Sequence, residues 1–414
     1  MLRKIWLDVV LGTLFIFGMM WGFSKMSSLG IFDAFDSVGM ALEEMSMTDI
    51  VFSQLREDPI ADDRIVLVNI GTLSRPEIGM LLDSISQHNP AVIGIDSFFD
   101  HYKEDSLGDM MLADAMSRVE NLVLVNKFHV NPLTDEVDSL VRSIPLFTQY
   151  AEEAPATLET DAEHQDDIKS CRQFWPKMTV NGNREVAFAI KLASYYDSAA
   201  AEDFLQRSYE TELINFKGNV LDYGATEFGT KFMALDFYDV FEQNYFPEMI
   251  EGKVVMFCFL GEYLGDTKSL EDKFVTPLNK RFVGRTLPDM YGGVIHANVV
   301  SMVLTGDYIN YMSALQGGII AIILCFLNVW LFTLIYKMIP KWYDGVTKVF
   351  QLIELGGMFT LMIFIFHWYN YKLDLTIAMA AIALSGDSLE VYHGVVKNAF
   401  TKEGRRSLFK RDKL

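Results

Sequence analysis

Two aspartates follow strands of a predicted sheet, where their carboxylates could take part in chemistry. Asp96 ends the apolar run "AVIGID", and Asp266 follows the run "VVMFCFLG" after a short loop. Open α/β sheets bind ligands at the carboxyl edge of their strands, so both carboxylates are candidate ligand contacts. The alternative is structural: each carboxylate could cap a helix or pair with a nearby base.

His296, in "VIHANVV", is a third candidate because an imidazole can exchange a proton near neutral pH. Its neighbours on the predicted helix are apolar, so a satisfied core histidine is the competing interpretation. No nucleophile with a partner base, phosphate-binding loop or metal-ligand spacing occurs in the sequence. We therefore expect a protein that is not an enzyme and that uses no cofactor and no catalytic or metal-binding residue.

The elements that would position these residues alternate between apolar strands and helices. The strand candidates are Ile65–Ile70, Val92–Ile95, Leu122–Val125, Leu213–Phe216 and Val254–Phe259. The helix candidates are Arg75–His88, Asp109–Val119, Arg184–Tyr196, Leu235–Glu242 and Met290–Leu304. Ser74 and Glu77 fit a capping box before the first of these helices. This order predicts an α/β domain with a mostly parallel sheet and helices on both faces.

An acidic segment interrupts this order between Tyr150 and Trp175. It contains "EEAPATLETDAEHQDD", so we expect a solvated surface insertion, and whether the acidic loop 152–167 has a function stays open. Cysteine is scarce: Cys171 and Cys258 could form a disulfide, although Cys258 lies in an apolar run and is better explained as a buried small side chain.

Charge divides the chain into regions. Residues 25–311 contain 22 Lys and Arg against 47 Asp and Glu, a net charge of −25, and the rest carries +5. Such an acidic domain repels phosphate backbones, so we expect no nucleic-acid partner. Solubility beside an anionic membrane explains the acidity most simply, and a cationic ligand or polybasic partner is the alternative.

Four segments are candidate membrane spans. They are Ile5–Met26, Met312–Tyr336, Val346–Phe366 and Leu373–Val396, each about long enough to cross ~30 Å of hydrocarbon. The last is the weakest because Asp387, Glu390 and His393 occupy its second half. The expected organisation is 1–26 cytoplasmic N-terminus and transmembrane anchor, 27–311 extracytoplasmic α/β domain, 312–396 three-helix membrane region and 397–414 basic cytoplasmic tail.

Basic residues set the predicted orientation. Arg3 and Lys4, the connection Lys337–Lys348 and the tail after Val396 would all lie on one face, which the positive-inside rule assigns to the cytoplasm. The expected location is a bacterial cytoplasmic (inner) membrane with lipid contacts, both termini inside and the large domain in the periplasm. An interfacial fourth segment would place the tail on the other side.

Three polar residues lie at matched depths in the predicted spans: Asn328, Glu354 and Asp387. Ionisable groups at such depth usually face a partner or a cavity. A hydrogen bond between Glu354 and Asn328 that locks the helices together is the simplest interpretation. An ion or proton route and contact with a partner's transmembrane helix are the alternatives.

Two stretches carry further information, "AVIGIDSFFD" with the later "DMMLADAM", and "GKVVMFCFLGEYLGDTKSLEDKFVTPL" running on to "YGGVIHANVVSMVL". Their order resembles the second CHASE family, the extracytoplasmic sensory domains associated with cyclases and histidine kinases. The family's "GID" turn falls on Gly94–Asp96, its Thr-Pro pair on Thr276 and Pro277, and its final helix on Gly293–Ala297. The resemblance implies ligand contacts at Asp96, Asp266, Thr276 and His296, to which we add Asn298 of the same helix.

Departures from the family pattern matter as well. Asn69 and Gly71 occupy the end of the first strand, where the family usually has an acid, so no ligand contact is assigned there. About eighteen residues follow the last span, too few for the usual catalytic output domain. The leading hypothesis is therefore a non-catalytic envelope sensor that binds a small ligand or envelope protein and signals in trans. The alternatives are a structural or docking subunit of a larger envelope complex and an ion-translocating subunit.

Overall fold

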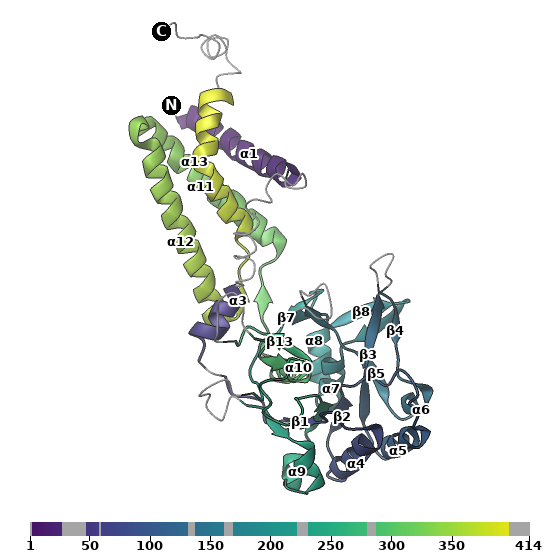
Figure 1. Cartoon of the computed structure of the whole chain (residues 1–414). Coiled ribbons are helices and arrows are strands. Elements are labelled where there is room, and N and C mark those ends of the chain that lie inside the picture. Colours follow the sequence, from purple (N-terminus) through teal and green to yellow (C-terminus); the bar gives the residue numbers. More distant parts are fainter. Residues whose placement is uncertain are drawn as a thin grey trace. The chain divides into compact units, whose positions relative to one another are not determined.

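The computed structural model describes residues 2–26, 47–57, 59–130, 137–160, 169–221, 231–279 and 287–396 (Figure 1). The chain divides into two compact units. One combines Met1–Val51 with Asn310–Leu414, and the other spans Phe52–Ile309. The first unit is helical, and the second is an α/β domain built around a sheet.

A seven-stranded sheet forms the centre of the α/β domain, with strand order β11-β1-β12-β2-β3-β4 and β5 also paired to β3. The strands are β1 (Ile65–Asn69), β2 (Val92–Ile95), β3 (Leu122–Val130), β4 (Val137–Val141), β5 (Glu152–Pro155), β11 (Met233–Leu235) and β12 (Val254–Cys258). Only β3 with β4 is antiparallel among these pairings. The prediction of a mostly parallel sheet is confirmed.

Helices cover both faces of this sheet. On one face lie α4 (Arg75–Ser86), α5 (Ser106–Met116) and α9 (Phe237–Phe241), and on the other α7 (Phe188–Tyr196) and α10 (Gly292–Thr305) (Figure 1). Side chains alternate along each strand, so a sheet covered twice needs apolar residues at every position. Every residue of β1, β2 and β12 is buried, which explains why the sequence shows continuous apolar runs.

The start of α4 shows how local sequence fixes one of these helices. The Glu77 carboxylate accepts a hydrogen bond from the Ser74 backbone N–H at 2.7 Å, and Pro76 occupies the first turn. The first N–H groups of a helix have no acceptor within the helix, so a side chain that accepts from one of them stabilises the start. A proline at this position has no N–H and therefore forfeits no hydrogen bond. The predicted capping box is confirmed.

A second sheet of five strands corrects the expectation for the acidic segment. Its order is β10-β7-β13-β14, with β6 paired to β7. The strands are β6 (Leu158–Thr160), β7 (Lys169–Phe174), β10 (Glu212–Leu213), β13 (Lys273–Val275) and β14 (Met290–Tyr291). Much of 150–175 is thus β structure and not a solvated insertion, because backbone hydrogen bonds pair these strands whatever their side chains. Residues 161–168 lie outside the described residues.

Several other boundaries differ from the sequence predictions: α5 begins three residues before the expected Asp109, and β3 continues to Val130, five residues beyond the expected Val125. The helix expected from Arg184 begins at Phe188, and residues before it form a hairpin of β8 (Lys177–Val180) with β9 (Asn183–Val186). The strand expected over Leu213–Phe216 is reduced to the two residues of β10. Cys171 and Cys258 are buried free thiols, so the disulfide alternative is wrong.

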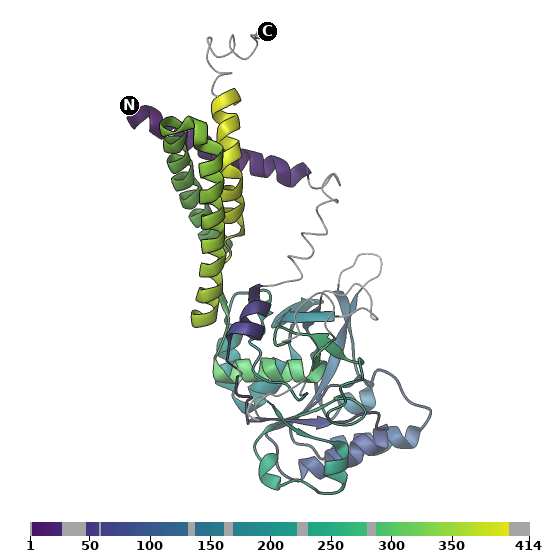
Figure 2. The ribbon, with the colours of Figure 1, turned by 60° about the vertical axis from the view of Figure 1, so that its left-hand side comes forward.

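The helical unit contains α1 (Leu2–Met26), α3 (Met47–Ile50), α11 (Ala314–Met338), α12 (Tyr343–Tyr369) and α13 (Thr376–Val391). α12 and α13 run side by side (Figure 2). Two helical segments, Ala314–Met338 and Pro340–Tyr369, are long and apolar enough to cross a membrane. The described apolar stretch of α1 is shorter, and α13 has 16 residues, so four spans are not confirmed.

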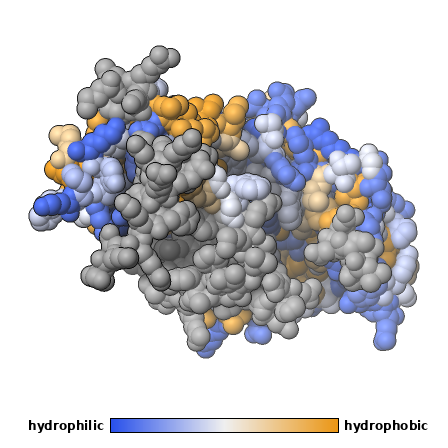
Figure 3. Space-filling view, turned by 90° about the horizontal axis from the view of Figure 1, so that it is seen from above, coloured by the Kyte–Doolittle hydropathy of each residue, from blue (hydrophilic) through white to orange (hydrophobic). Residues whose placement is uncertain are grey.

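Surface polarity agrees with the composition of the two units. Hydrophilic residues dominate the right-hand side of Figure 3, on the side where β4 lies in Figure 1. In the candidate span Pro340–Tyr369, only 11% of the residues in the most apolar stretch are buried by the protein itself, although the mean hydropathy of that stretch is 2.0. An apolar helix with so little protein cover needs lipid or other helices around it.

Candidate functional site

The carboxyl ends of β2 and β12 meet the amino end of α10, and three titratable side chains gather there. Asp96 directly follows β2, and its backbone N–H donates to the Phe257 carbonyl at 2.8 Å. Asp272 ends the loop before β13, where its carbonyl accepts from the Gly292 N–H at 3.0 Å. His296 lies one turn into α10. We call Asp96, Asp272 and His296 the acid–histidine cluster.

Two glycines allow the close approach of these groups. A Cβ on Gly293 would lie 2.4 Å from the Cys258 Cβ and 3.6 Å from Asp96 Oδ2. A Cβ on Gly292 would lie 3.0 Å from both carboxyl oxygens of Asp272. Although Asp272 as a residue is exposed, its carboxyl group is thus pressed against the start of α10. Both carboxylates lie where a helix amino end favours negative charge.

Burial and mutual charge shift the titration of the cluster. Burial raises the pKa of Asp96, and neighbouring His296 opposes that shift. Burial and the charge of Asp96 raise the pKa of Asp272 to about 8. Burial lowers the pKa of His296, against the opposing effect of Asp96. These shifts favour the protonated form of Asp272 and the neutral form of the His296 imidazole.

The cluster has unused hydrogen-bonding capacity. Within the described part of the chain, no side chain forms a hydrogen bond with the carboxylate of Asp96 or Asp272 or with a ring nitrogen of His296. His296 is only 3% exposed and meets the Phe188 ring edge-on at 5.4 Å between ring centres. Among the described residues, no three His, Cys, Asp or Glu side chains are arranged to hold a metal ion.

Asp266 has a structural role, which was the alternative to a ligand contact: its side chain accepts hydrogen bonds from its own loop. Its Oδ1 accepts from the backbone N–H groups of Lys268 at 2.8 Å and Ser269 at 3.2 Å, which lowers the pKa of this carboxyl. Its carbonyl accepts from Lys273 Nζ and the Tyr291 hydroxyl. Asp266 therefore organises the loop that ends at Asp272.

Thr276 and Asn298 are also engaged within the domain. Thr276 donates through its N–H and hydroxyl to the buried carboxylate of Asp289, at 2.8 and 2.7 Å. Asn298 accepts from the N–H groups of Lys217 and Gly218 and donates to the Gly218 carbonyl, all within 3.0 Å. The Asn298 side chain therefore holds the segment around Lys217 against α10, and Thr276 is joined to Asp289. These hydrogen bonds leave the two side chains little capacity to bind a ligand.

Two residues, Asp272 and Asn69, have roles in the structure that the sequence did not indicate. Asp272 lies in the polar segment "SLEDKF", and nothing in the neighbouring sequence indicates that its carboxyl group faces α10. Asn69 stands at the end of β1, where it accepts from the N–H groups of Gly71 and Leu260 and donates to Asp236 and the Gly261 carbonyl. The end of the first strand is thus a structural junction, and its departure from the family pattern was the available signal.

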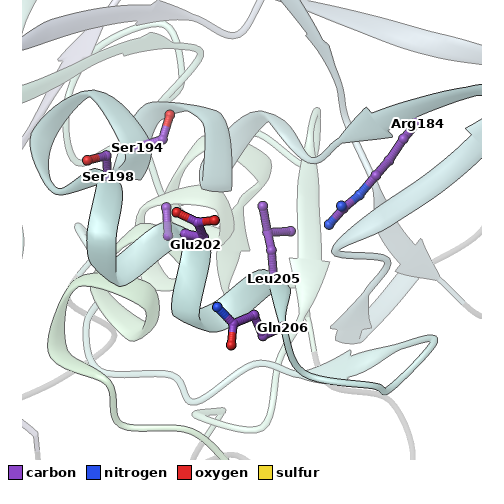
Figure 4. Close-up of a pocket in the computed structure, with 7 residues that line it drawn as sticks. Arg184, Ser194, Ser198, Glu202, Leu205 and Gln206 are labelled. Atoms are coloured by element: carbon purple, nitrogen blue, oxygen red, sulfur yellow. The ribbon is translucent and has the colours of Figure 1, made fainter.

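A separate depression lies between α7, β9 and α8 (Ser198–Leu205). It has a volume of about 350 Å³ (Figure 4). Its lining residues are Arg184, Ser194, Ser198, Ala201, Glu202, Leu205 and Gln206. In Figure 4 Arg184 extends from its strand across from Leu205. None of the residues expected from the sequence lines it.

The polar residues of the helical unit divide into two groups. Asn328 Nδ2 donates to Glu354 Oε2 at 2.8 Å, so this expected hydrogen bond is present. Asp387 does not share it: both its oxygens accept from Lys348 Nζ at 2.7 Å, and both side chains are largely exposed. The three residues lie on three different helices, α11, α12 and α13, and matched depth does not fix which face of its helix each side chain occupies.

Comparison with known proteins fits this geometry. The sequence model of the CHASE2 domain family matches residues 13–335, from within α1 through the α/β domain into α11. No curated protein and no solved structure matches the chain. CHASE2 domains are extracytoplasmic sensory domains, in agreement with the resemblance found in the sequence. The match covers well over half of the 414 residues, and the chain therefore belongs to the CHASE2 domain family.

Proposed function

We propose that this protein is a non-catalytic sensor in a bacterial inner membrane. Its periplasmic α/β domain receives a signal at the acid–histidine cluster, and the helical unit passes the resulting state to another polypeptide. Membership of a sensory domain family and the absence of a catalytic motif in the sequence support this proposal.

The observation that carries the proposal is the position of the cluster at the amino end of α10. This helix is buried along its length from Gly292 to Leu304 and ends at Gly306, whose φ of 67° breaks the helix. Only seven residues separate Gly306 from Ala314, the first residue of α11. A change at the cluster would therefore act on a rigid element joined by a short connection to a candidate span.

Hydrogen exchange on the full-length chain in lipid nanodiscs tests this coupling. Asp96→Asn combined with Asp272→Asn should change amide protection in α10 and also in α11, α12 or α13. Glu120→Gln, at an exposed acid, is the matched control and should change neither. An effect of the double variant that stops within the α/β domain would contradict the sensor proposal.

The topology belongs to the same proposal. Four membrane spans with both termini in the cytoplasm would place the first residues, the connection near Lys341 and the tail from Lys397 where a cytoplasmic partner can contact them. A reporter active only in the cytoplasm should be active when fused after Leu414 and silent when inserted near Glu159. The opposite pattern would overturn the orientation.

One feature favours the second candidate function, a docking subunit of an envelope complex. Helices α4 and α5 expose large apolar side chains: Met80, Leu107, Met110 and Met111 are between 43% and 61% exposed. Exposed apolar groups on adjacent helices are typical of protein contacts. Under this function, Leu107→Glu with Met110→Glu should release the chain from its complex without changing its thermal unfolding. A complex that survives the double variant would exclude this face.

A further inference from the structure

We propose that the depression between α7, α8 and β9 binds the zwitterion of an α-amino acid with an aliphatic side chain. Arg184 holds the carboxylate of this ligand, and Glu202 holds its ammonium group. The inference goes beyond the proposed function, because none of the residues that line the depression belongs to the acid–histidine cluster. It rests on the charges, the free polar groups and the apolar surface that line one cavity.

The two charged residues of the depression have opposite signs, and both are unpaired. Within the described part of the chain, neither the Arg184 guanidinium nor the Glu202 carboxylate forms a hydrogen bond or an ion pair. Glu185, the next residue on the same strand, differs because it pairs with Arg142 at 3.4 Å. Opposite charges that line one cavity without meeting leave a gap that a ligand with both charges can bridge. The guanidinium fork matches the two oxygens of a carboxylate, and a carboxylate accepts from ammonium N–H groups.

A hydrogen bond fixes the strand that carries Arg184 against α8. Arg184 lies on β9 and is paired with Thr179 of β8. Lys177, also on β8, donates through Nζ to the Leu205 carbonyl at 2.7 Å and to the Arg207 carbonyl at 3.3 Å. This contact ties the hairpin to the C-terminal end of α8, and in Figure 4 Arg184 extends from its strand toward that helix. The two sides of the depression are therefore held in place before any ligand binds.

One face of α8 forms the wall that carries the acid. Ser198, Glu202 and Leu205 are separated by four and three residues, so they share a side of the helix. Ala201 lines the depression next to Glu202. Ala201 and Leu205 give this wall an apolar part, on which an aliphatic side chain can bury its surface.

The size of the depression and its remaining polar groups suit a small ligand. Its volume of about 350 Å³ is at the lower end of the range for small-molecule sites. The Ser198 hydroxyl and the Gln206 amide line it, and neither side chain forms a hydrogen bond within the described residues. The Ser194 hydroxyl donates to the Lys191 carbonyl at 2.7 Å and keeps its lone pairs as acceptors. These groups can bind the ligand in addition to the two charges.

Isothermal titration calorimetry of the full-length chain in nanodiscs, with L-leucine as the probe, tests the proposal. Isocaproate is leucine without its ammonium group, and isopentylamine is leucine without its carboxylate. We expect saturable binding of leucine, and binding of each analogue that is weaker by at least about tenfold, because one charged contact is lost. Titrations into empty nanodiscs correct for partition of the probes into lipid.

Two variants assign the charged contacts. Arg184→Ala should no longer distinguish leucine from isopentylamine, because the partner of the carboxylate is gone. Glu202→Ala should no longer distinguish leucine from isocaproate. Both side chains are exposed, and circular dichroism verifies that each variant is folded. Asp203→Ala, at an exposed acid beside Glu202 that does not line the depression, is the matched control and should bind leucine as the wild type does.

The outcome is separable from that of the sensor proposal, which hydrogen exchange in α10 to α13 tests without any of these probes. Absence of saturable leucine binding would overturn the amino-acid site, and so would an analogue that binds the wild type as tightly as leucine does. Unchanged leucine binding by Arg184→Ala or Glu202→Ala would overturn it as well.

Discussion

The α/β domain and the helical unit each contain a short ion pair, and the two pairs differ in surroundings more than in geometry. Arg75 and Asp109 meet at 2.5 Å, and their side chains are 7% and 1% exposed. Lys348 and Asp387 meet at 2.7 Å, and theirs are 48% and 62% exposed. Breaking a buried pair leaves a charge without water, so equal distances do not mean equal contributions to stability.

Some glycines show the same contrast, although Gly12, Gly317 and Gly386 of the helical unit also have neighbouring atoms 3.0 to 3.1 Å from their Cβ positions. In the α/β domain, side-chain or backbone atoms lie within 3.0 Å of the Cβ positions of Gly94, Gly218 and Gly293. Nothing lies within 4 Å of those of Gly318, Gly345, Gly356 and Gly357 in the helical unit. The outer domain is close-packed against itself, whereas the described helices keep free faces that lipid or a partner can fill.

The largest expected effect is on the buried ion pair. Asp109→Ala should lower the free energy of unfolding by roughly 3–5 kcal/mol, because it strands the Arg75 guanidinium among Phe99 and Phe147. Asp387→Ala in the helical unit should cost at most about 1 kcal/mol. Urea unfolding followed by circular dichroism measures both. Equal costs would break the comparison between the two units.

A substitution at Gly293 tests the close packing. Gly293→Ala should destabilise the α/β domain by about 1–3 kcal/mol, because its Cβ would overlap Cys258. Gly357→Ala is the matched control and should stabilise α12 slightly, since alanine favours helix by up to about 1 kcal/mol. Thermal unfolding of both variants shows whether each substitution lowers or raises the stability. A neutral Gly293→Ala would show that α10 can shift away from β12.

The buried carboxyl of Asp289 gives the α/β domain a pH dependence of its own. Burial raises its pKa to about 7, although Thr276 and Asn279 donate to it. The folded state therefore binds this proton more tightly than the unfolded state does. The stability it contributes is complete below about pH 4 and is lost as pH rises to about 7, at up to about 1.4 kcal/mol per unit.

Asp289→Asn isolates this contribution, because the amide keeps one acceptor and does not titrate. Denaturant midpoints of the two proteins, compared from pH 4 to pH 8, should diverge, with the wild type losing stability relative to the variant as pH rises. Parallel curves would show that Asp289 has an ordinary pKa.

The smallest expected effect is on the hydrogen bond between Asn328 and Glu354. Glu354→Gln should keep the helices associated, because an amide still accepts from Asn328. Glu354→Leu should cost about 0.6 kcal/mol, the average for hydrogen bonds within membranes. Unfolding in mixed detergent micelles measures the difference. Loss of function in a fully assembled Glu354→Gln variant would instead favour an ion-handling role for this carboxyl.

Apolar runs and helix-capping residues made much of the fold predictable. The strands β1, β2 and β12 were visible as apolar runs, and the start of α4 was visible from Ser74 and Glu77, because each signal lies within a few residues. The hairpin before Phe188 and the strands in the acidic segment were not visible in the sequence, because their charged side chains favour exposure. Pairing with distant strands decided their structure instead.

The sequence by itself determined the chemical types at the site: Asp96 at a strand end, His296 on a helix, and membership of a sensory family. Only the tertiary structure decided which groups meet. It placed the carboxyl groups of Asp272 and Asp96 at the start of α10, gave Asp266, Thr276 and Asn298 internal partners, and paired Asp387 with Lys348. The physical reason is that a hydrogen bond or a charge interaction depends on distances of a few ångströms between segments far apart in the chain, and the chemical type of a residue does not set such distances.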